Sequence, residues 1–203
     1  MPRAYRSPVR AEAAQITRSA IVAAARELFA ERGYARAGVA AIAERAGVAL
    51  NTVYTSVGGK PALIAAVAQD ATEDTAIEAA LTEAAEAADG RRILRVLADG
   101  TAEVTRRQSQ TLRFLLESRS TEPAVAEAAE RAFDRYRERL AGAASRLSSL
   151  GALRPGIGAE RAAQVLWFYF GVSAWATARE VGWTWDEAAD WLCAQAAAAL
   201  LED

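Results

Sequence analysis

Small hydrogen-bonding side chains recur at helical spacing just after residue 50. On a helical wheel Asn51, Thr52 and Thr55 share one side, and the opposite side is apolar. The apolar side consists of Leu50, Val53 and Val57. Amides and hydroxyls in such an arrangement contact base edges and phosphates, so the pattern is typical of a helix that reads duplex DNA. We expect the apolar side to pack against the rest of the protein.

Two further side chains near this helix have the chemistry of phosphate contacts. Tyr54 lies at the flank of the polar side, where its phenol can reach a phosphate. Lys60 precedes Pro61 at the start of the next helix and adds a cation beside that helix's N–H groups. Taken singly, each residue also has a simpler interpretation. Tyr54 can be a partly packed surface aromatic, and Lys60 can be a solvated cation.

Short helices and glycine turns would position these side chains. A first helix is predicted from about Gln15 to Glu31, ending at Gly33. A second covers about Val39 to Ala46, and Gly47 can take the left-handed conformation that a tight turn demands. The polar-faced helix then spans 50–56 and is closed by Gly58-Gly59. These dimensions are those of a helix-turn-helix unit.

The local sequence is more specific than these dimensions. Residues 21–34 (IVAAARELFAERGY) resemble the first helix of the tetracycline-repressor (TetR) family, and residues 39–48 (VAAIAERAGV) resemble its second helix and turn. Thr52-Val53-Tyr54 and Lys60-Pro61-Ala62-Leu63 are similar to the recognition helix and the start of the fourth helix. The resemblance covers about residues 16–65.

The resemblance implies an all-α homodimer with an N-terminal three-helix DNA-binding domain and a larger helical bundle for ligand binding and dimerisation. By position, the DNA-contacting residues would be Leu50, Asn51, Thr52, Tyr54, Thr55 and Lys60. Several positions depart from the family pattern: Ala37-Gly38 and Ala49 replace hydroxyl residues that cap helices, and Leu50 stands where a basic or polar residue is frequent. Val57 and Gly58-Gly59 replace the usual aromatic and serine residues. A missing cap costs roughly 1 kcal/mol.

Composition narrows the class of function. Histidine is absent and Cys193 is the only cysteine, which argues against a disulfide, a transition-metal site and the commonest general base. We therefore expect no enzyme, no metal and no cofactor. Residues 1–60 carry nine Arg and Lys against four Glu, a net charge of +5, and the rest of the chain carries −7. A basic N-terminal region followed by an acidic remainder is typical of a chain whose N-terminal module binds a polyanion.

Beyond residue 60 the pattern predicts helices over 60–71, 74–88, 91–106, 108–119, 123–150, 158–181 and 184–201. Thr184 and Glu187 have the spacing of a capping box. Residues 1–14 contain Pro2 and Pro8 and lack an apolar face, which predicts a flexible arm. The expected domains are thus residues 15–60 for DNA binding and 61–203 for ligand binding and dimerisation.

All five tryptophans lie between residues 167 and 191. Buried interfaces favour aromatic residues, and the family pairs its last two helices, so a dimer contact is expected along 158–181 and 184–201. The same aromatics can instead fill the core of one subunit.

An effector pocket, if present, is expected between the middle helices. Its candidate lining is apolar and aromatic: Leu94, Leu97, Phe114, Phe133, Tyr136, Trp167 and Phe170. Aromatics at helical spacing also occur in an ordinary core, and that alternative stays open.

The sequence as a whole predicts a cytoplasmic, ligand-responsive homodimeric repressor without a membrane segment. It would bind a palindromic operator in double-stranded DNA and release it on binding a small hydrophobic molecule. The alternative is a helical small-molecule-binding or sequestering protein whose DNA-binding domain is degenerate.

Overall fold

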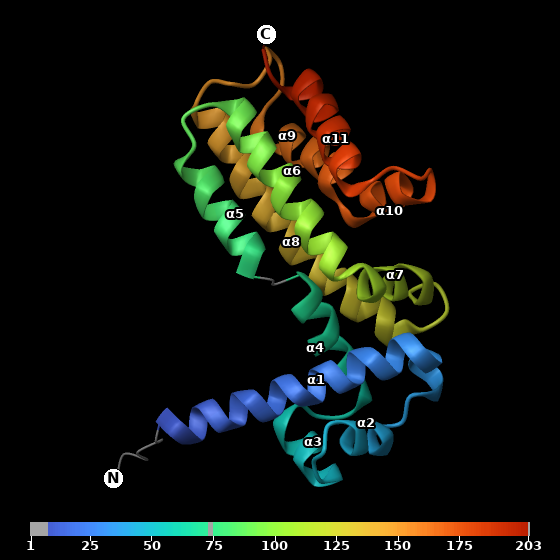
Figure 1. Ribbon diagram of the computed structural model, residues 1–203. Coiled ribbons are helices and arrows are strands. Elements are labelled where there is room, and N and C mark those ends of the chain that lie inside the picture. The colour runs from blue at the N-terminus through green and yellow to red at the C-terminus, as the bar shows by residue number, and fades with distance from the viewer. Residues whose placement is uncertain (1–7, 73–74, 203) are drawn as a thin grey trace. The chain divides into compact units, whose positions relative to one another are not determined.

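The computed structural model describes residues 8–72 and 75–202, and throughout these ranges the ordered elements are α-helices apart from one isolated bridge between Leu153 and Leu201. The all-α fold class predicted from the sequence is confirmed (Figure 1). No helix within the described ranges is both long and apolar enough to cross a membrane.

The chain separates into two compact units. The first contains the residues up to Asp70 together with Phe114–Glu130, and the second contains Ala71–Arg113 and the chain from Arg131 onward. The expected division at residue 60 differs from this one, because residues 61–70 and 114–130 group with the helix-turn-helix. Phe114 shows why: its ring stacks on Phe29, with centroids 6.1 Å apart.

The first unit begins with α1 (Pro8–Arg36), which is interrupted at Gly33 by a φ of 75° and a ψ of 162°. Then come α2 (Val39–Arg45), α3 (Leu50–Ser56) and α4 (Lys60–Thr72). α1, α2 and α3 pack on one another. Their contact buries apolar residues from each helix, among them Leu28, Phe29, Ile42 and Val53. This apolar contact fixes α3, which is too short to be stable alone.

Helix α1 corrects one prediction. It begins at Pro8, so residues 8–14 are helical and not a flexible arm; residues 1–7 lie outside the described residues. Proline is well suited to the first turn of a helix, where no N–H partner is needed.

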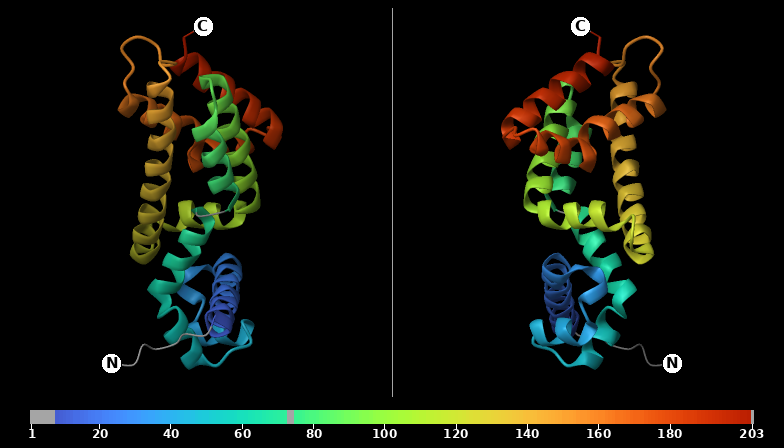
Figure 2. Two further views of the ribbon diagram at one scale, coloured as in Figure 1. Left: turned by 90° about the vertical axis from the view of Figure 1, so that its left-hand side faces the viewer. Right: turned by 90° about the vertical axis from the view of Figure 1, so that its right-hand side faces the viewer.

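The second unit contains α5 (Thr75–Glu86), α6 (Gly90–Arg107), α9 (Ala159–Phe170), α10 (Val172–Glu180) and α11 (Trp185–Leu200). The helices α7 (Ser109–Ser118) and α8 (Pro123–Ser149) contribute to both units. α6 lies beside α5 and α11, as both turned views in Figure 2 show. One apolar cluster that includes Ile93, Leu140, Leu166 and Trp175 holds these helices together.

The predicted helix over 158–181 is wrong, because the chain breaks at Gly171 into α9 and α10. A Cβ atom built on Gly171 would lie 2.4 Å from the carbonyl oxygen of Trp167, closer than real Cβ atoms come. Only glycine fits at this bend. The capping box predicted at the start of α11 is confirmed, since the Thr184 and Glu187 side chains each accept a hydrogen bond from the other's backbone N–H.

Candidate nucleic-acid interface

The α2–α3 turn holds α3 through one apolar anchor and one glycine. Val53, at the centre of α3, is fully buried, and Ile42 and Ala43 of α2 are buried as well. Gly47 has a φ of 68°, the left-handed conformation expected for the turn. The carbonyl of Ala43 accepts a hydrogen bond of 3.0 Å from the Val48 N–H and closes the turn. α3 is therefore fixed on one side and free on the other.

The free side of α3 carries most of the predicted DNA-contacting residues. Asn51 and Thr55 are exposed, Thr52 is half-buried, and Tyr54 is 51% exposed. Leu50 is 44% exposed, so the inward orientation expected from the helical wheel is wrong. A helical side chain leans toward the N-terminus of its helix. At the first residue of α3 there is no preceding turn to cover it.

Lys60 is held at the start of α4 by the end of α1. Its Nζ donates a 2.8 Å hydrogen bond to the Ala35 carbonyl and lies 4.6 Å from the centroid of the Tyr34 ring. Burial raises the pKa of the Tyr34 phenol, which keeps this ring neutral. Tyr34 also packs on Phe29, with ring centroids 5.5 Å apart. The ammonium of Lys60 thus has a fixed place beside α3 and its turn.

One contact to α3 was missed in the sequence. Arg18 of α1 donates a 2.8 Å hydrogen bond to the carbonyl of Ser56, the last residue of α3. A cation near a helix C-terminus satisfies a carbonyl that has no partner inside the helix. The only signal in the sequence was an arginine on the first helix, with nothing to connect it to residue 56.

Two other arginines of this unit are paired with carboxylates. Arg45 contacts Glu27 at 3.0 Å and Glu31 at 3.1 Å, and this guanidinium lowers the pKa of Glu31. Arg26 contacts Asp70 at 3.3 Å. The departures at the helix starts are confirmed, because Gly38 and Ala49, the N-cap residues of α2 and α3, make no side-chain cap.

The predicted effector residues lie in different surroundings. Leu94, Leu97, Tyr136 and Phe170 are buried in the core cluster of the second unit, and Trp167 is partly buried against it. Phe133 is buried, with its ring centroid 6.1 Å from that of Trp167. Phe114 belongs to the first unit, where it stacks on Phe29.

A small apolar hollow lies in the second unit, next to Tyr136. Its volume is about 20 Å³, and of the predicted effector residues only Tyr136 is in its lining. The other lining residues are Ala71, Thr72, Ile77, Thr101, Val104, Thr105, Leu112 and Val172. The Tyr136 hydroxyl donates a 2.8 Å hydrogen bond to the Phe170 carbonyl, and burial raises the pKa of this phenol. Such a hollow has room for about one water molecule.

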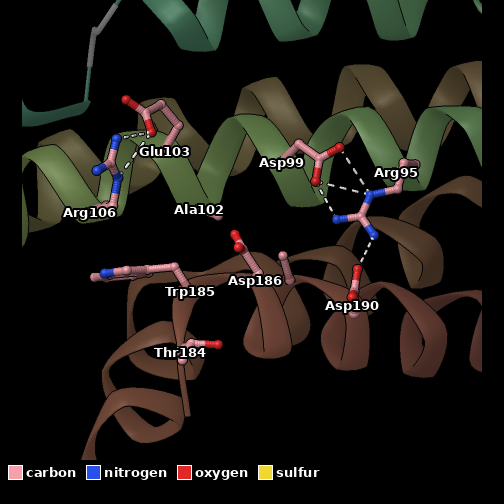
Figure 3. Close-up of a pocket in the computed structure, with 10 residues that line it drawn as sticks. Arg95, Asp99, Ala102, Glu103, Arg106, Thr184, Trp185, Asp186 and Asp190 are labelled. Carbon is pink, nitrogen blue, oxygen red and sulfur yellow. Dashed lines mark hydrogen bonds and ion pairs between the residues drawn. The ribbon is translucent and has the colours of Figure 1, made fainter.

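A larger hollow of about 630 Å³ lies between α6 and the start of α11 (Figure 3), and it is charged, not apolar. Arg95 of α6 binds Asp99 on the same helix and contacts Asp190 of α11 at 2.6 Å. Arg106 contacts Glu103 at 2.7 Å. The Trp185 ring forms part of the wall. The sequence did not reveal this groove, since Arg95 and Asp190 are far apart along the chain.

The C-terminal helices expose large apolar side chains. Phe168 of α9 is 72% exposed and Trp191 of α11 is 47% exposed, and Val181 follows α10 at 62%. Trp175 is fully buried, so the tryptophans divide between the core and the surface.

Comparison with known proteins adds a family match. Residues 21–67 match the model of the family described as bacterial regulatory proteins, tetR family. No curated protein matches the chain.

Solved structures share the fold over nearly the whole chain. SmeT of Stenotrophomonas maltophilia, in complex with triclosan, is 21% identical, with 92% of each chain covered and a TM-score of 0.72. FadR of Bacillus subtilis, in complex with stearoyl-CoA, is 19% identical over 89% of this chain and 98% of its own, with a TM-score of 0.74. NalD of Pseudomonas aeruginosa, the secondary repressor of a multidrug efflux pump, is 21% identical over 94% and 98%, with a TM-score of 0.72.

Proposed function

We propose that the chain is a DNA-binding transcriptional regulator of the TetR family, whose model matches residues 21–67, and that it acts as a ligand-responsive repressor that binds its operator through α3. The proposal rests on one observation: one side of α3 is buried in its domain and the other side is exposed to solvent. Its buried Val53 fixes the helix, while Asn51, Tyr54 and Thr55 remain exposed. A helix held in this way can enter the major groove without rearranging its own domain.

The proposed contacts follow from the chemistry of each side chain. Asn51 and Thr55 face base edges, and Thr52 and Tyr54 reach the phosphates on either side. Lys60 approaches a phosphate while it keeps its hydrogen bond to Ala35, because an ammonium has three donors. Because α3 carries no charge, Lys60 would contribute much of the salt dependence.

We propose that the repressor is a homodimer formed through α9 and α11. Phe168 and Trp191 are large and apolar, and they are exposed in the single chain. A second copy would remove both from water. A symmetric dimer binds two half-sites in inverted order, about 34–36 Å apart when they are one helical turn from each other.

The proposed effector is a small hydrophobic molecule that enters beside Tyr136. The similar structures of SmeT and FadR hold triclosan and stearoyl-CoA, which both have apolar bodies. The hollow of about 20 Å³ is too small for either, so binding requires the helices around it to move apart. Such a movement favours a second arrangement of the dimer, in which the recognition helices no longer match the operator.

DNA binding is tested by selecting duplexes from a random pool and measuring affinity against salt. Replacing Tyr54 and Lys60 by alanine should weaken binding to every selected duplex and reduce the salt slope by about 1. Arg154→Ala, which removes an exposed cation from the second unit, is the matched control and should bind as the unaltered protein does. An unchanged slope in the double variant would contradict the assigned contacts.

Effector binding is tested by thermal shift with triclosan and with stearoyl-CoA as probes. A stabilised protein that also loses its selected duplex supports the proposal. Thr105→Leu adds a small apolar group to the hollow from a half-buried position and should weaken both effects. If a probe binds but no duplex is ever selected, the chain is a small-molecule-binding protein with a degenerate DNA-binding domain.

A further inference from the structure

The recognition helix α3 is uncharged along its whole length. Its sequence, LNTVYTS, contains no arginine, lysine, aspartate or glutamate. Arginine and lysine make the commonest contact with guanine, and acidic side chains accept from cytosine. Neither contact is available from α3, so its readout has to use apolar, amide and hydroxyl groups.

Leu50 is the apolar group in the best position. It is the first residue of α3 and is 44% exposed, and in helix-turn-helix proteins the N-terminal residues of this helix reach base edges. A leucine side chain gains free energy only from contact with another apolar group. In the major groove the apolar group on a base edge is the 5-methyl of thymine.

The neighbouring polar residues favour the same kind of base pair. Asn51 is exposed, and an asparagine amide pairs with the N6 and N7 atoms of adenine. The Thr55 hydroxyl lies 3.0 Å from the Asn51 carbonyl and 3.2 Å from the Thr52 carbonyl, so its proton is donated within the helix. Its lone pairs remain to accept from the amino group of adenine or of cytosine, so Thr55 is compatible with an A·T pair while the preference for it comes from Leu50 and Asn51.

We propose that Leu50 is a specificity-determining residue that reads the 5-methyl group of a thymine in each half-site, next to an adenine read by Asn51. The inference rests on the proposed operator binding by α3. It assigns A·T pairs to the positions that the first turn of α3 contacts.

The test replaces each thymine of one selected half-site by deoxyuridine, which removes only the methyl group. The unaltered protein should lose about fourfold in affinity at one position, the value of one buried methyl group. Leu50→Asn keeps the size of the side chain and removes its apolar character, so this variant should bind thymine and uracil duplexes equally. Its free energy of unfolding should change by less than about 0.5 kcal/mol, because Leu50 is 44% exposed.

Val181→Asn is the matched control, an exposed apolar residue of the second unit that should keep the fourfold preference. Equal binding of thymine and uracil at every position by the unaltered protein would overturn the role of Leu50 and leave operator binding intact. A thymine preference that persists in Leu50→Asn would overturn it too. If the unaltered protein selects no duplex at all, the proposed function itself fails.

Discussion

The two units of this chain differ in the surface they leave open. The first unit exposes the uncharged helix α3, and Arg18, Arg26 and Arg45 of this unit contact carboxylates or a carbonyl. The second unit exposes large apolar side chains at Phe168 and Trp191, and its charged groove is lined by groups that pair across α6 and α11. The exposed side chains of α3 in the first unit are thus mostly polar, whereas those of α9 and α11 in the second unit include large apolar ones.

The comparison implies different outcomes for surface substitutions in the first unit and for core substitutions in the second. Surface changes in the first unit should alter binding without altering stability. Core changes in the second should alter stability, and binding only as a consequence. Four experiments test this contrast.

Trp175→Ala should have the largest effect. Trp175 is fully buried, and its indole N–H donates a 3.2 Å hydrogen bond to the Phe170 carbonyl. Truncating a buried tryptophan lowers the free energy of unfolding by about 3–5 kcal/mol. Urea denaturation followed by circular dichroism measures the loss, and Val181→Ala, at a 62% exposed position outside the proposed dimer contact, is the control. Equal losses in both variants would show that the burial of Trp175 does not set the stability of the second unit.

The two sides of α3 provide the next contrast. Val53→Ala should cost about 2 kcal/mol because it removes buried methyl groups. Tyr54→Ala should change stability by less than about 0.5 kcal/mol, since its ring is half exposed. Thermal melts of the two variants, with duplex binding measured in parallel, separate the roles. The two-sided description of α3 is wrong if Tyr54→Ala proves the more destabilising.

Adding a missing cap should stabilise the first unit by a smaller amount. Ala49 is the N-cap of α3 and makes no side-chain hydrogen bond. A serine there can accept from an N–H of the first turn, which is worth about 1 kcal/mol. Gly38→Ser should yield only a few tenths of a kcal/mol, because glycine is itself a tolerated N-cap. Ala49→Ser should therefore raise the melting temperature more than Gly38→Ser does. The reverse order would contradict this prediction.

The smallest effect concerns pH. Hydrogen bonds from the backbone and side chain of Thr184 lower the pKa of Glu187 below its ordinary value of 4.5. A lowered pKa means that the ionised carboxylate stabilises the fold above pH 4.5, and that this contribution is lost as the pH falls through the folded value. Glu187→Gln keeps the capping geometry without the charge, so its stability should vary less between pH 5 and 3. If the free energy of unfolding of the two proteins depends on pH in the same way, Glu187 contributes nothing through its charge.

Local features of this fold were predictable from the sequence where nearby residues determine them. The turn at Gly47 and the capping box of Thr184 and Glu187 depend on residues within a few positions, and both were confirmed. The break at Gly171 was missed because it depends on the approach of the Trp167 carbonyl, which an apolar run does not reveal.

The candidate site was also predictable only where nearby residues determine the structure. The exposure of Asn51 and Thr55 follows from helical periodicity. That of Leu50 does not, because periodicity takes no account of a helix end. Phe114 was predicted to line the effector pocket because it is aromatic, whereas its ring stacks on Phe29. Likewise, the contact from Arg18 to Ser56 joins residues that no sequence pattern connects.

The place of Lys60 has a practical consequence. It is the single lysine of the chain, and its side chain lies against Ala35 and Tyr34 at the start of α4. Amine-reactive reagents therefore have one ε-amino target per subunit, in the unit that carries α3. A dye attached there would report on that unit alone, and acetylation would remove the charge without changing any other side chain.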